Sequence, residues 1–223
     1  MAHMTPHITI QPKTKKDLIA EILREAIISG EFVPGERLLQ ADLALRFEVS
    51  PTPIREAVQQ LVAEGVLSHS PYRGVQVAEA RLEDVNEVYM IRGVIEELAT
   101  RTAVYNLRVV DARQLRIYHD DMQMHVKQGE LQALRKLNYE FHMLIYRASH
   151  LPVLLNMIRL LWTKFPWDTL HVLPNRAASM LNEHQQILDA INAGDAELAG
   201  NLMRTHIESG SAALRAYLSQ AGK

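Results

Sequence analysis

The chain has 223 residues, of which 48% are apolar and 22% are charged, and its formal net charge is −2. This length fits one large or two modest domains, and the apolar share is sufficient for a buried core. The absence of cysteine excludes disulfides and thiolate metal sites, and no apolar run is long enough to cross a membrane, so we expect a cytoplasmic protein with no membrane partner.

The first third of the chain predicts a winged helix-turn-helix domain over residues 4–78, with the opening Met-Ala-His set aside as an expression remnant. Apolar residues recur at helical spacing over 15–29, a short second helix is expected over 40–47, and a third over about 51–64. Residues 66–77 then alternate in polarity around a glycine-containing turn, which is typical of a hairpin. Helices followed by such a hairpin place one helix in the major groove of DNA.

The remainder, residues 82–220, predicts an all-helical bundle, so the expected fold class is mainly α. Its apolar spacing has a helical period throughout, interrupted by glycine, proline and polar residues. These breaks divide it into about six helices, over residues 82–105, 111–128, 130–149, 152–164, 177–193 and 195–219. A bundle of this size can enclose a small-molecule pocket between its helices.

Charge alone does not identify DNA as the partner. Residues 1–79 hold 8 Lys/Arg and 10 Asp/Glu, whereas nucleic-acid-binding domains are commonly basic. Binding to DNA therefore requires the positive side chains to gather on one face, and weak non-specific binding is expected.

Three motifs near the N-terminus point to one family. They are Pro-Gly-Glu-Arg-Leu at 34–38, Val-Ser-Pro-Thr-Pro-Ile-Arg-Glu-Ala at 49–57 and Glu-Gly-Val-Leu at 64–67. In order and spacing they resemble the GntR family of bacterial transcription regulators. The helical remainder resembles the FCD ligand-binding domain of the FadR-type subfamily, and its helix count favours the VanR-like branch. The residues that carry this second likeness are Arg92, Glu96, Asn138, Phe141, His142, His184 and His206.

The predicted DNA-binding residues lie in the third helix and around it. They are Arg37, Thr52, Arg55, Gln59, Arg73 and Gly74. The resemblance implies DNA contacts for Arg37, Arg55, Thr52 and the wing glycine Gly74. Gln59 is added because it shares the outer helix face, and Arg73 because it lies in the wing. From both places long side chains reach bases and phosphates. On periodicity alone, a solvated helix face explains Arg55 equally well.

Four polar residues of the bundle form a candidate metal site. Asn138 and His142 are four residues apart and share one helix face. His184 and His206 lie 22 residues apart across a glycine, which suits two facing helices. The resemblance implies that all four bind a divalent metal ion, and these ligands suit zinc or nickel best, with manganese or iron as further options. A lone histidine is more often a hydrogen-bonded core residue, so a metal-free pocket that binds its ligand directly stays open.

An anion is the expected occupant of this pocket. Because the four ligands are neutral, a bound metal keeps its double positive charge, and a small organic acid is the predicted effector. Arg92 is the first candidate to bind its carboxylate, since a guanidinium pairs bidentately with that group. Arg135, about one turn before Asn138, is the second candidate.

These features predict a ligand-responsive transcription regulator; a repressor is favoured, and an activator stays open. A homodimer would present two recognition helices to a pseudo-palindromic operator in double-stranded DNA. Two alternatives stay open: a DNA-binding dimer whose bundle senses no ligand, and a metal-dependent hydrolase. Enzyme activity is not expected, because the sequence has no His-Glu-x-x-His segment and no evident general base beside the histidines.

Overall fold

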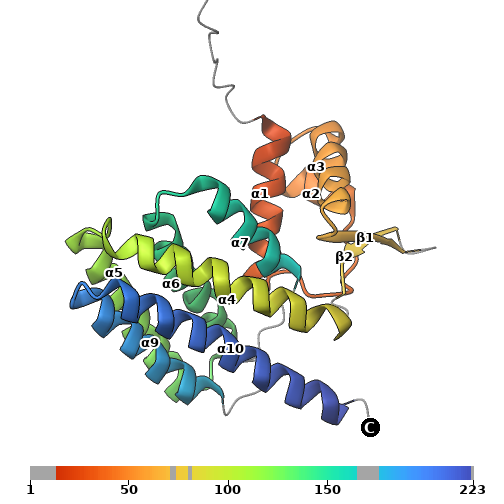
Figure 1. Ribbon diagram of the computed structural model, residues 1–223. Coiled ribbons are helices and arrows are strands. Elements are labelled where there is room, and N and C mark those ends of the chain that lie inside the picture. The colour runs from red at the N-terminus through yellow and green to blue at the C-terminus, as the bar shows by residue number, and fades with distance from the viewer. Residues whose placement is uncertain (1–13, 71–73, 80–81, 165–175, 222–223) are drawn as a thin grey trace, which may run out of the picture.

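Two hydrophobic cores divide the molecule into a small N-terminal head and a larger helical bundle (Figure 1). The computed structural model describes residues 14–70, 74–79, 82–164 and 176–221. The head contains α1 (Lys15–Ile28), α2 (Gln40–Arg46), α3 (Pro51–Ala63), β1 (Leu67–Ser70) and β2 (Gly74–Val77). The bundle contains α4 (Leu82–Val104), α5 (Val109–Gln128), α6 (Leu131–Ala148), α7 (Pro152–Lys164), α9 (Arg176–Asn192) and α10 (Ala196–Ala221). The predicted mainly helical fold is confirmed, with a winged helix-turn-helix and a bundle of which the described residues form six helices.

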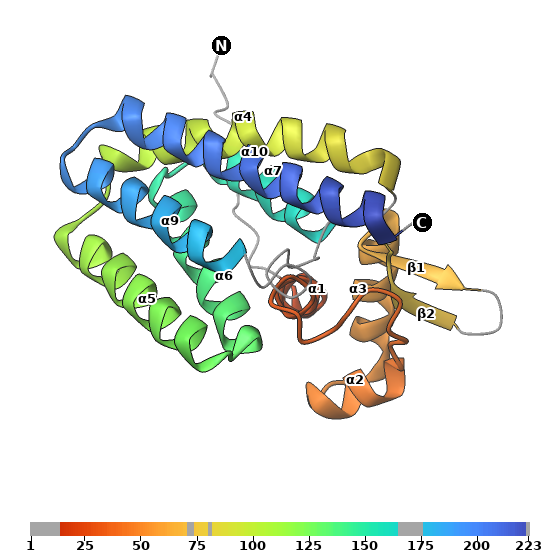
Figure 2. The ribbon, with the colours of Figure 1, turned by 90° about the horizontal axis from the view of Figure 1, so that it is seen from below.

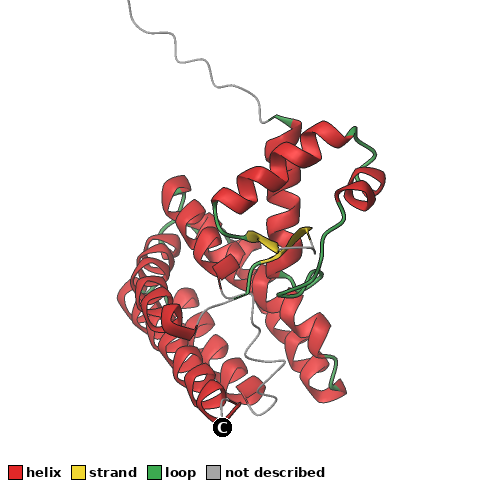
Figure 3. Ribbon diagram, turned by 90° about the vertical axis from the view of Figure 1, so that its right-hand side faces the viewer, coloured by secondary structure: helices red, strands yellow, loops and turns green. Residues whose placement is uncertain are grey.

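The head folds from signals that its sequence carries. Helix α1 begins at a capping box, in which the Thr14 hydroxyl accepts from the Asp17 amide and the Asp17 carboxylate accepts from the Thr14 amide. Strand β1 pairs antiparallel with β2, with Leu67 opposite Val77, and the two strands form a small hairpin beside the helices (Figure 3). Ser50 stands at the N-cap of α3, and its side chain makes no capping hydrogen bond.

In the bundle, α4 and α10 lie side by side, and α5, α6 and α9 complete the packing around them (Figure 2). Helix α6 supplies the centre of the core with the fully buried Phe141 and Tyr146. Asp195 caps α10, because its carboxylate accepts from the Leu198 amide. Helix α5 begins at Val109, and Asp111 in its first turn accepts from the Arg108 amide.

Helices α1 and α7 form the junction between the head and the bundle (Figure 1). Ile28, the last residue of α1, belongs to the bundle core, while Leu160 of α7 packs against the head core. Arg159 of α7 pairs with Glu21 of α1 at 3.0 Å. Among the helices that the structure describes, none combines the length and the hydropathy needed to cross a bilayer.

Candidate DNA-binding surface and metal centre

The outer face of α3 presents three of the predicted DNA-binding side chains. Thr52, Arg55 and Gln59 are exposed, whereas Ile54 and Val58 are buried in the head core. Within the described part of the chain, Arg55 makes no ion pair or side-chain hydrogen bond, so its guanidinium is available to a phosphate or a base edge. The α3 face is therefore suited to enter a groove of DNA.

The remaining predicted DNA-binding residues belong to the wing and its neighbour. Arg37 is exposed and its backbone forms a bridge to Gln76 of β2, which places it beside the hairpin. Gly74 has a φ of +79°, which favours glycine, and no described atom lies within 4 Å of where a Cβ would be. Arg73 lies outside the described residues.

Three histidines from three helices meet inside the bundle. His142 (α6), His184 (α9) and His206 (α10) are 1%, 0% and 8% exposed, and one ring nitrogen of each lies within 4.8 Å of the others. The Nε2 atoms of His142 and His184 are 3.2 Å apart. Two nitrogens bound tetrahedrally to one zinc ion lie about 3.3 Å apart. The spacing of this His triad therefore fits a single shared ion.

The ring of His142 is held by a chain of buried hydrogen bonds. Its Nδ1 lies 3.0 Å from the Tyr146 hydroxyl, which in turn donates to the Glu96 carboxylate. Glu96 also accepts from Nε of Arg92 at 2.6 Å and from Nε1 of Trp162 at 3.0 Å. Because the hydroxyl gives its proton to Glu96, it accepts one from Nδ1 of His142, and the lone pair of that ring stands on Nε2.

His206 has an equivalent support on the other side of the triad. Its Nδ1 lies 2.6 Å from Oε2 of Glu183, and Glu183 also accepts two hydrogen bonds from Arg176, at 2.8 and 2.6 Å. A carboxylate behind a histidine is the usual arrangement around metal-bound imidazoles, because it fixes the ring and leaves the far nitrogen free. For His206, that free nitrogen is Nε2.

Two polar atoms of the candidate ligands have no hydrogen-bond partner among the described residues. They are Oδ1 of Asn138 and Nδ1 of His184, both buried. Asn138 precedes His142 by one turn on the same face of α6. A buried amide oxygen without a partner costs free energy, and a metal ion is one group that would satisfy it. The chemistry of the donor set, three imidazoles and one amide, fits a divalent ion of the zinc or nickel type.

Burial sets the charge of two rings of the triad. It lowers the pKa of His142 and His184 well below the ordinary value, and the nearby His206 adds to the effect. For Glu183, burial acts to raise the pKa, but hydrogen bonds from His206 and Arg176 outweigh it and bring the value down to about 2. At neutral pH the site therefore offers His142 and His184 as neutral imidazoles, the form that binds metal, and Glu183 behind the third ring is ionised.

Comparison with known proteins is consistent with this geometry. The family model described as "Bacterial regulatory proteins, gntR family" matches residues 15–77, and the FCD domain model matches residues 87–209, more than half of the chain. The chain belongs to the GntR family. Its bundle is an FCD domain, and the resemblance expected from the motifs is confirmed.

Relatives of this GntR protein are transcription regulators. It is 29% identical over 196 residues to the HTH-type transcriptional regulator McbR of Escherichia coli K12, covering 86% of each chain. It is 28% identical over 192 residues to the HTH-type regulator YdhC of Bacillus subtilis, covering 82% of this chain and 84% of that one. The chain is accordingly a DNA-binding transcription regulator and not an enzyme.

Solved structures show the same fold. The E. coli McbR/YncC structure superposes with a TM-score of 0.80 at 26% identity, covering 94% of this chain and all of that one. A GntR regulator from Rhodococcus sp. RHA1 gives a TM-score of 0.68 at 26% identity, with 90% and 97% covered. The arrangement of head and FCD domain is thus shared with known members of the family.

The structure separates the two arginines predicted to bind an effector. Arg92 is buried next to the triad. The ring centroids of Tyr89 and Trp162 each lie 4.8 Å from its guanidinium carbon. Arg135 instead reaches out of the FCD domain to the head, where it donates to the backbone carbonyls of Ile27 and Ile28. The expectation from sequence placed Arg135 in the pocket because it shares a helix with Asn138, but its long side chain extends towards the end of α1.

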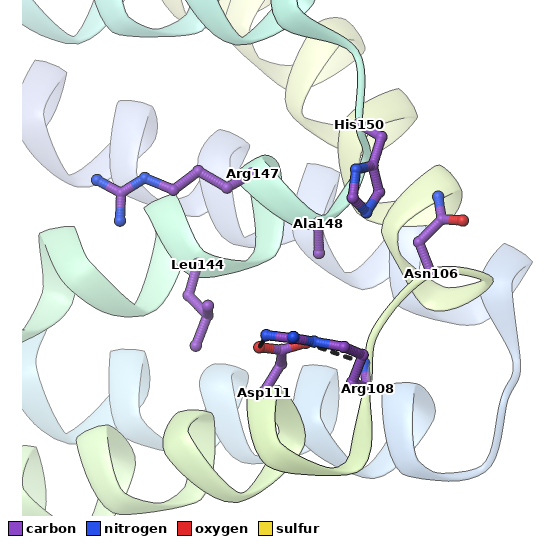
Figure 4. A pocket seen from close by; sticks show the side chains of 7 residues that line it. All are labelled: Asn106, Arg108, Asp111, Leu144, Arg147, Ala148 and His150. Carbon is purple, nitrogen blue, oxygen red and sulfur yellow. Dashed lines mark hydrogen bonds and ion pairs between the residues drawn. The ribbon is translucent and has the colours of Figure 1, made fainter.

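A pocket of about 360 Å³ lies elsewhere in the FCD domain, between the start of α5 and the end of α6 (Figure 4). It is lined by Asn106, Arg108, Asp111, Leu144, Arg147, Ala148 and His150. The Arg108 guanidinium is already paired with the Asp111 carboxylate at 2.8 and 2.9 Å, and Figure 4 shows Arg147 pointing away from that pair. None of the triad residues lines this pocket.

Several residues around the candidate metal centre were not identified from sequence. Tyr146 follows His142 by four residues, so it continues the helix face of Asn138 and His142, and this spacing was an available signal. The ring centroid of Trp162 lies 5.4 Å from that of His142. Glu183 gave no signal, because its role depends on how α9 faces α10.

Proposed function

We propose that this GntR protein is a repressor whose FCD domain binds a divalent metal ion and a small carboxylate effector, and that this binding controls its affinity for an operator. The observation that carries the proposal is the convergence of three buried imidazoles. Two of these rings have their second nitrogen engaged by a hydrogen-bonded acidic network. Such support is expected of metal ligands and is costly to build for packing alone.

The proposed ligands are His142, His184, His206 and the amide oxygen of Asn138. Zinc or nickel suits this set best, and manganese or iron are the alternatives. When bound, the ion supplies a positive charge to which an anionic effector can coordinate. The acidic groups around the ligands are already paired with arginines, so the protein itself does not cancel the charge of the ion.

Arg92 is the proposed second contact for the effector carboxylate. In the described part of the chain its only hydrogen bond is made by Nε, to Glu96. Its two Nη nitrogens therefore remain for a bidentate contact with a carboxylate. Since the rings of the triad are almost inaccessible to solvent, an effector that reaches them must shift the side chains that cover them. That requirement links binding to a change in the bundle.

DNA binding is assigned to the head, through Arg37, Thr52, Arg55, Gln59, Arg73 and Gly74. A homodimer would place two copies of α3 on a pseudo-palindromic operator. Helix α4 offers a surface for pairing with a second copy, because Met90, Val94 and Leu98 recur every four residues along one face and are 67%, 51% and 48% exposed. As a DNA-binding regulator, the protein is proposed to act in the cytoplasm.

The test combines a ligand screen with DNA binding. The full chain is stripped with a chelator, reloaded with Zn²⁺ or Ni²⁺, and screened by thermal shift against small mono-, di- and tricarboxylates. Stabilising acids are then added to a complex with a duplex selected from a random pool. We expect the acids to stabilise the protein only when metal is present. A stabilising acid should also weaken the affinity for the duplex by roughly 5- to 150-fold, the usual range of allosteric coupling.

The same screen distinguishes the alternative functions. A protein that binds its duplex but takes up no metal and is stabilised by no acid would be a DNA-binding dimer without a sensor. Stabilisation by acids that does not depend on metal would indicate that the histidines and Arg92 bind the effector directly.

A further inference from the structure

Two cations of the FCD domain cap helices of the head. Arg135 donates to the carbonyls of Ile28 and Ile27 at the end of α1, at 3.1 and 3.3 Å. Lys164 donates from Nζ to the carbonyls of Glu64 and Gly65 at the end of α3, at 2.9 and 3.4 Å. The last carbonyls of a helix have no partner inside it and carry the negative end of its dipole, so a cation there is favourable.

The head has a glycine at each of these contacts. Gly65 has a φ of +69°, and a Cβ built there would lie 2.6 Å from Nζ of Lys164. Gly30 has a φ of +81°, and a Cβ there would collide with the guanidinium of Arg135. Both glycines therefore serve the backbone turn and also the close approach of a side chain from the other domain. A Cβ at either glycine would displace the end of the cation that caps the helix.

Helix α7 touches the His triad on one side and the head on the other. Trp162 lies 5.4 Å from the ring of His142 and donates from Nε1 to Glu96, which also receives the hydroxyl that holds His142. Two residues further along, Lys164 caps α3, and two residues earlier Leu160 packs against the head core. One stretch of this helix, residues 160–164, therefore contacts the candidate metal centre through Trp162 and the DNA-binding domain through Leu160 and Lys164.

The junction leaves buried polar atoms without partners among the described residues. These are the Tyr139 hydroxyl, beside Trp162 at a ring distance of 5.9 Å, and Nε of Arg159, whose Nη1 pairs with Glu21. Unsatisfied buried groups raise the free energy of this arrangement. Such a cost is expected where an interface must also adopt a second arrangement.

We propose that α7 couples the metal centre to the recognition helix, with Trp162 responding to occupancy of the triad and Lys164 transmitting the response to the C-terminal end of α3. Metal coordination fixes the ring of His142, against which the indole packs. A shift or a stiffening of α7 then changes how firmly the end of α3 is held. The inference rests on the proposed metal site.

The experiment measures hydrogen exchange in the full chain, after chelation and with added Zn²⁺, in peptides covering residues 60–67. The variant is Lys164→Met, which keeps the alkyl stem and removes the ammonium. The control is Lys127→Met, an exposed lysine of α5. Zn²⁺ affinity is measured for each protein by calorimetry. If Lys164→Met lowers the helical content, Lys164→Gln replaces it, because its shorter amide removes the same charge.

We expect Zn²⁺ to slow exchange over 60–67 in the parent and in Lys127→Met by roughly fivefold or more, the lower end of typical coupling. In Lys164→Met, Zn²⁺ should bind with unchanged affinity while exchange over 60–67 no longer responds. Binding of Zn²⁺ without any response in the parent, or an equal response in Lys164→Met, would overturn the coupling and leave the metal site intact. Absence of Zn²⁺ binding in all the proteins would instead refute the metal site, and the coupling with it.

Discussion

At the scale of single residues, the rings of the triad differ in how their second nitrogens are held. His142 and His206 each have Nδ1 engaged by a neighbour, whereas Nδ1 of His184 is buried without a partner among the described residues. The third ring is positioned by packing, since it stacks on Phe141 with ring centroids 4.5 Å apart. We therefore expect the supports of the first two rings to determine metal affinity.

The first prediction concerns Tyr146. Tyr146→Phe keeps the ring and removes the hydroxyl that accepts from His142 and donates to Glu96, so the orientation of the His142 ring is no longer fixed. Loss of such a supporting group commonly lowers metal affinity by about 10- to 100-fold, and calorimetric titration with Zn²⁺ measures it. Tyr118→Phe, on half-buried Tyr118 of α5, is the control. Equal affinity in the two variants would show that the hydroxyl has no role at the metal.

The second prediction concerns Arg55. Its guanidinium is exposed on the outer face of α3 and has no partner among the residues that the structure describes, so Arg55→Ala should weaken binding to the selected duplex while the fold is kept. One good base contact is worth about 1–3 kcal/mol, or roughly 5- to 150-fold in affinity. Gel-shift titration compares it with Arg113→Ala, which removes an exposed arginine of α5. If Arg55→Ala binds the duplex as tightly as Arg113→Ala does, Arg55 does not contact DNA.

Individual site residues were predictable from sequence where a motif or a helix face identified them. The three histidines were found because their spacing matches a family pattern, and the structure brings them together. Arg135 could not be placed, since a long side chain on a helix can reach either inward or across a domain junction. Lys164 gave no signal, because its partners are backbone carbonyls 99 and 100 residues away.

At the scale of elements, the helix boundaries followed the chain's own signals. Glycines with positive φ end α1, α5 and α9, at Gly30, Gly129 and Gly194. Pro152 opens α7, where a missing amide proton costs nothing. What the sequence did not reveal is the second role of α7, because contact with both domains depends on tertiary packing and not on local pattern.

The third prediction concerns the exposed face of α4. Val94→Glu places a charge in the centre of the Met90–Leu98 row and should dissociate the proposed dimer. A buried valine contributes about 1.5–3 kcal/mol, and twofold symmetry makes the change twice in each interface. Light scattering after size exclusion measures the mass. The control is Ile117→Glu, at a side chain of α5 that is also half exposed. Equally stable dimers in both variants would show that this face of α4 is not the dimer interface.

At the scale of the whole molecule, the two cores and the junction make one regulator from two domains. The head supplies the surface that reads DNA, and the FCD domain supplies a buried site. The contacts of α7 and Arg135 hold the head in a defined position on the bundle. Regulation then requires only that occupancy of the triad changes the stability of this position.

The fourth prediction concerns stability and pH. Burial lowers the pKa of His142 and His184 in the folded protein, whereas an unfolded histidine titrates near pH 6.5. Below that pH the unfolded chain binds protons that the folded chain does not, so the metal-free protein should lose stability as the pH falls from about 7.5 to about 5.5. Urea midpoints measure the loss. His184→Phe should reduce the slope and His125→Gln should keep it, and an unchanged slope in His184→Phe would contradict this origin.

The most direct test is a calorimetric titration of the chelator-treated chain with Zn²⁺, repeated for His184→Phe and for His125→Gln, which lies outside the triad. We predict one ion bound per chain by the parent and by His125→Gln, and none by His184→Phe at the same concentrations. Uptake of no ion by the parent, or equal uptake by all three proteins, would contradict a metal centre at these histidines.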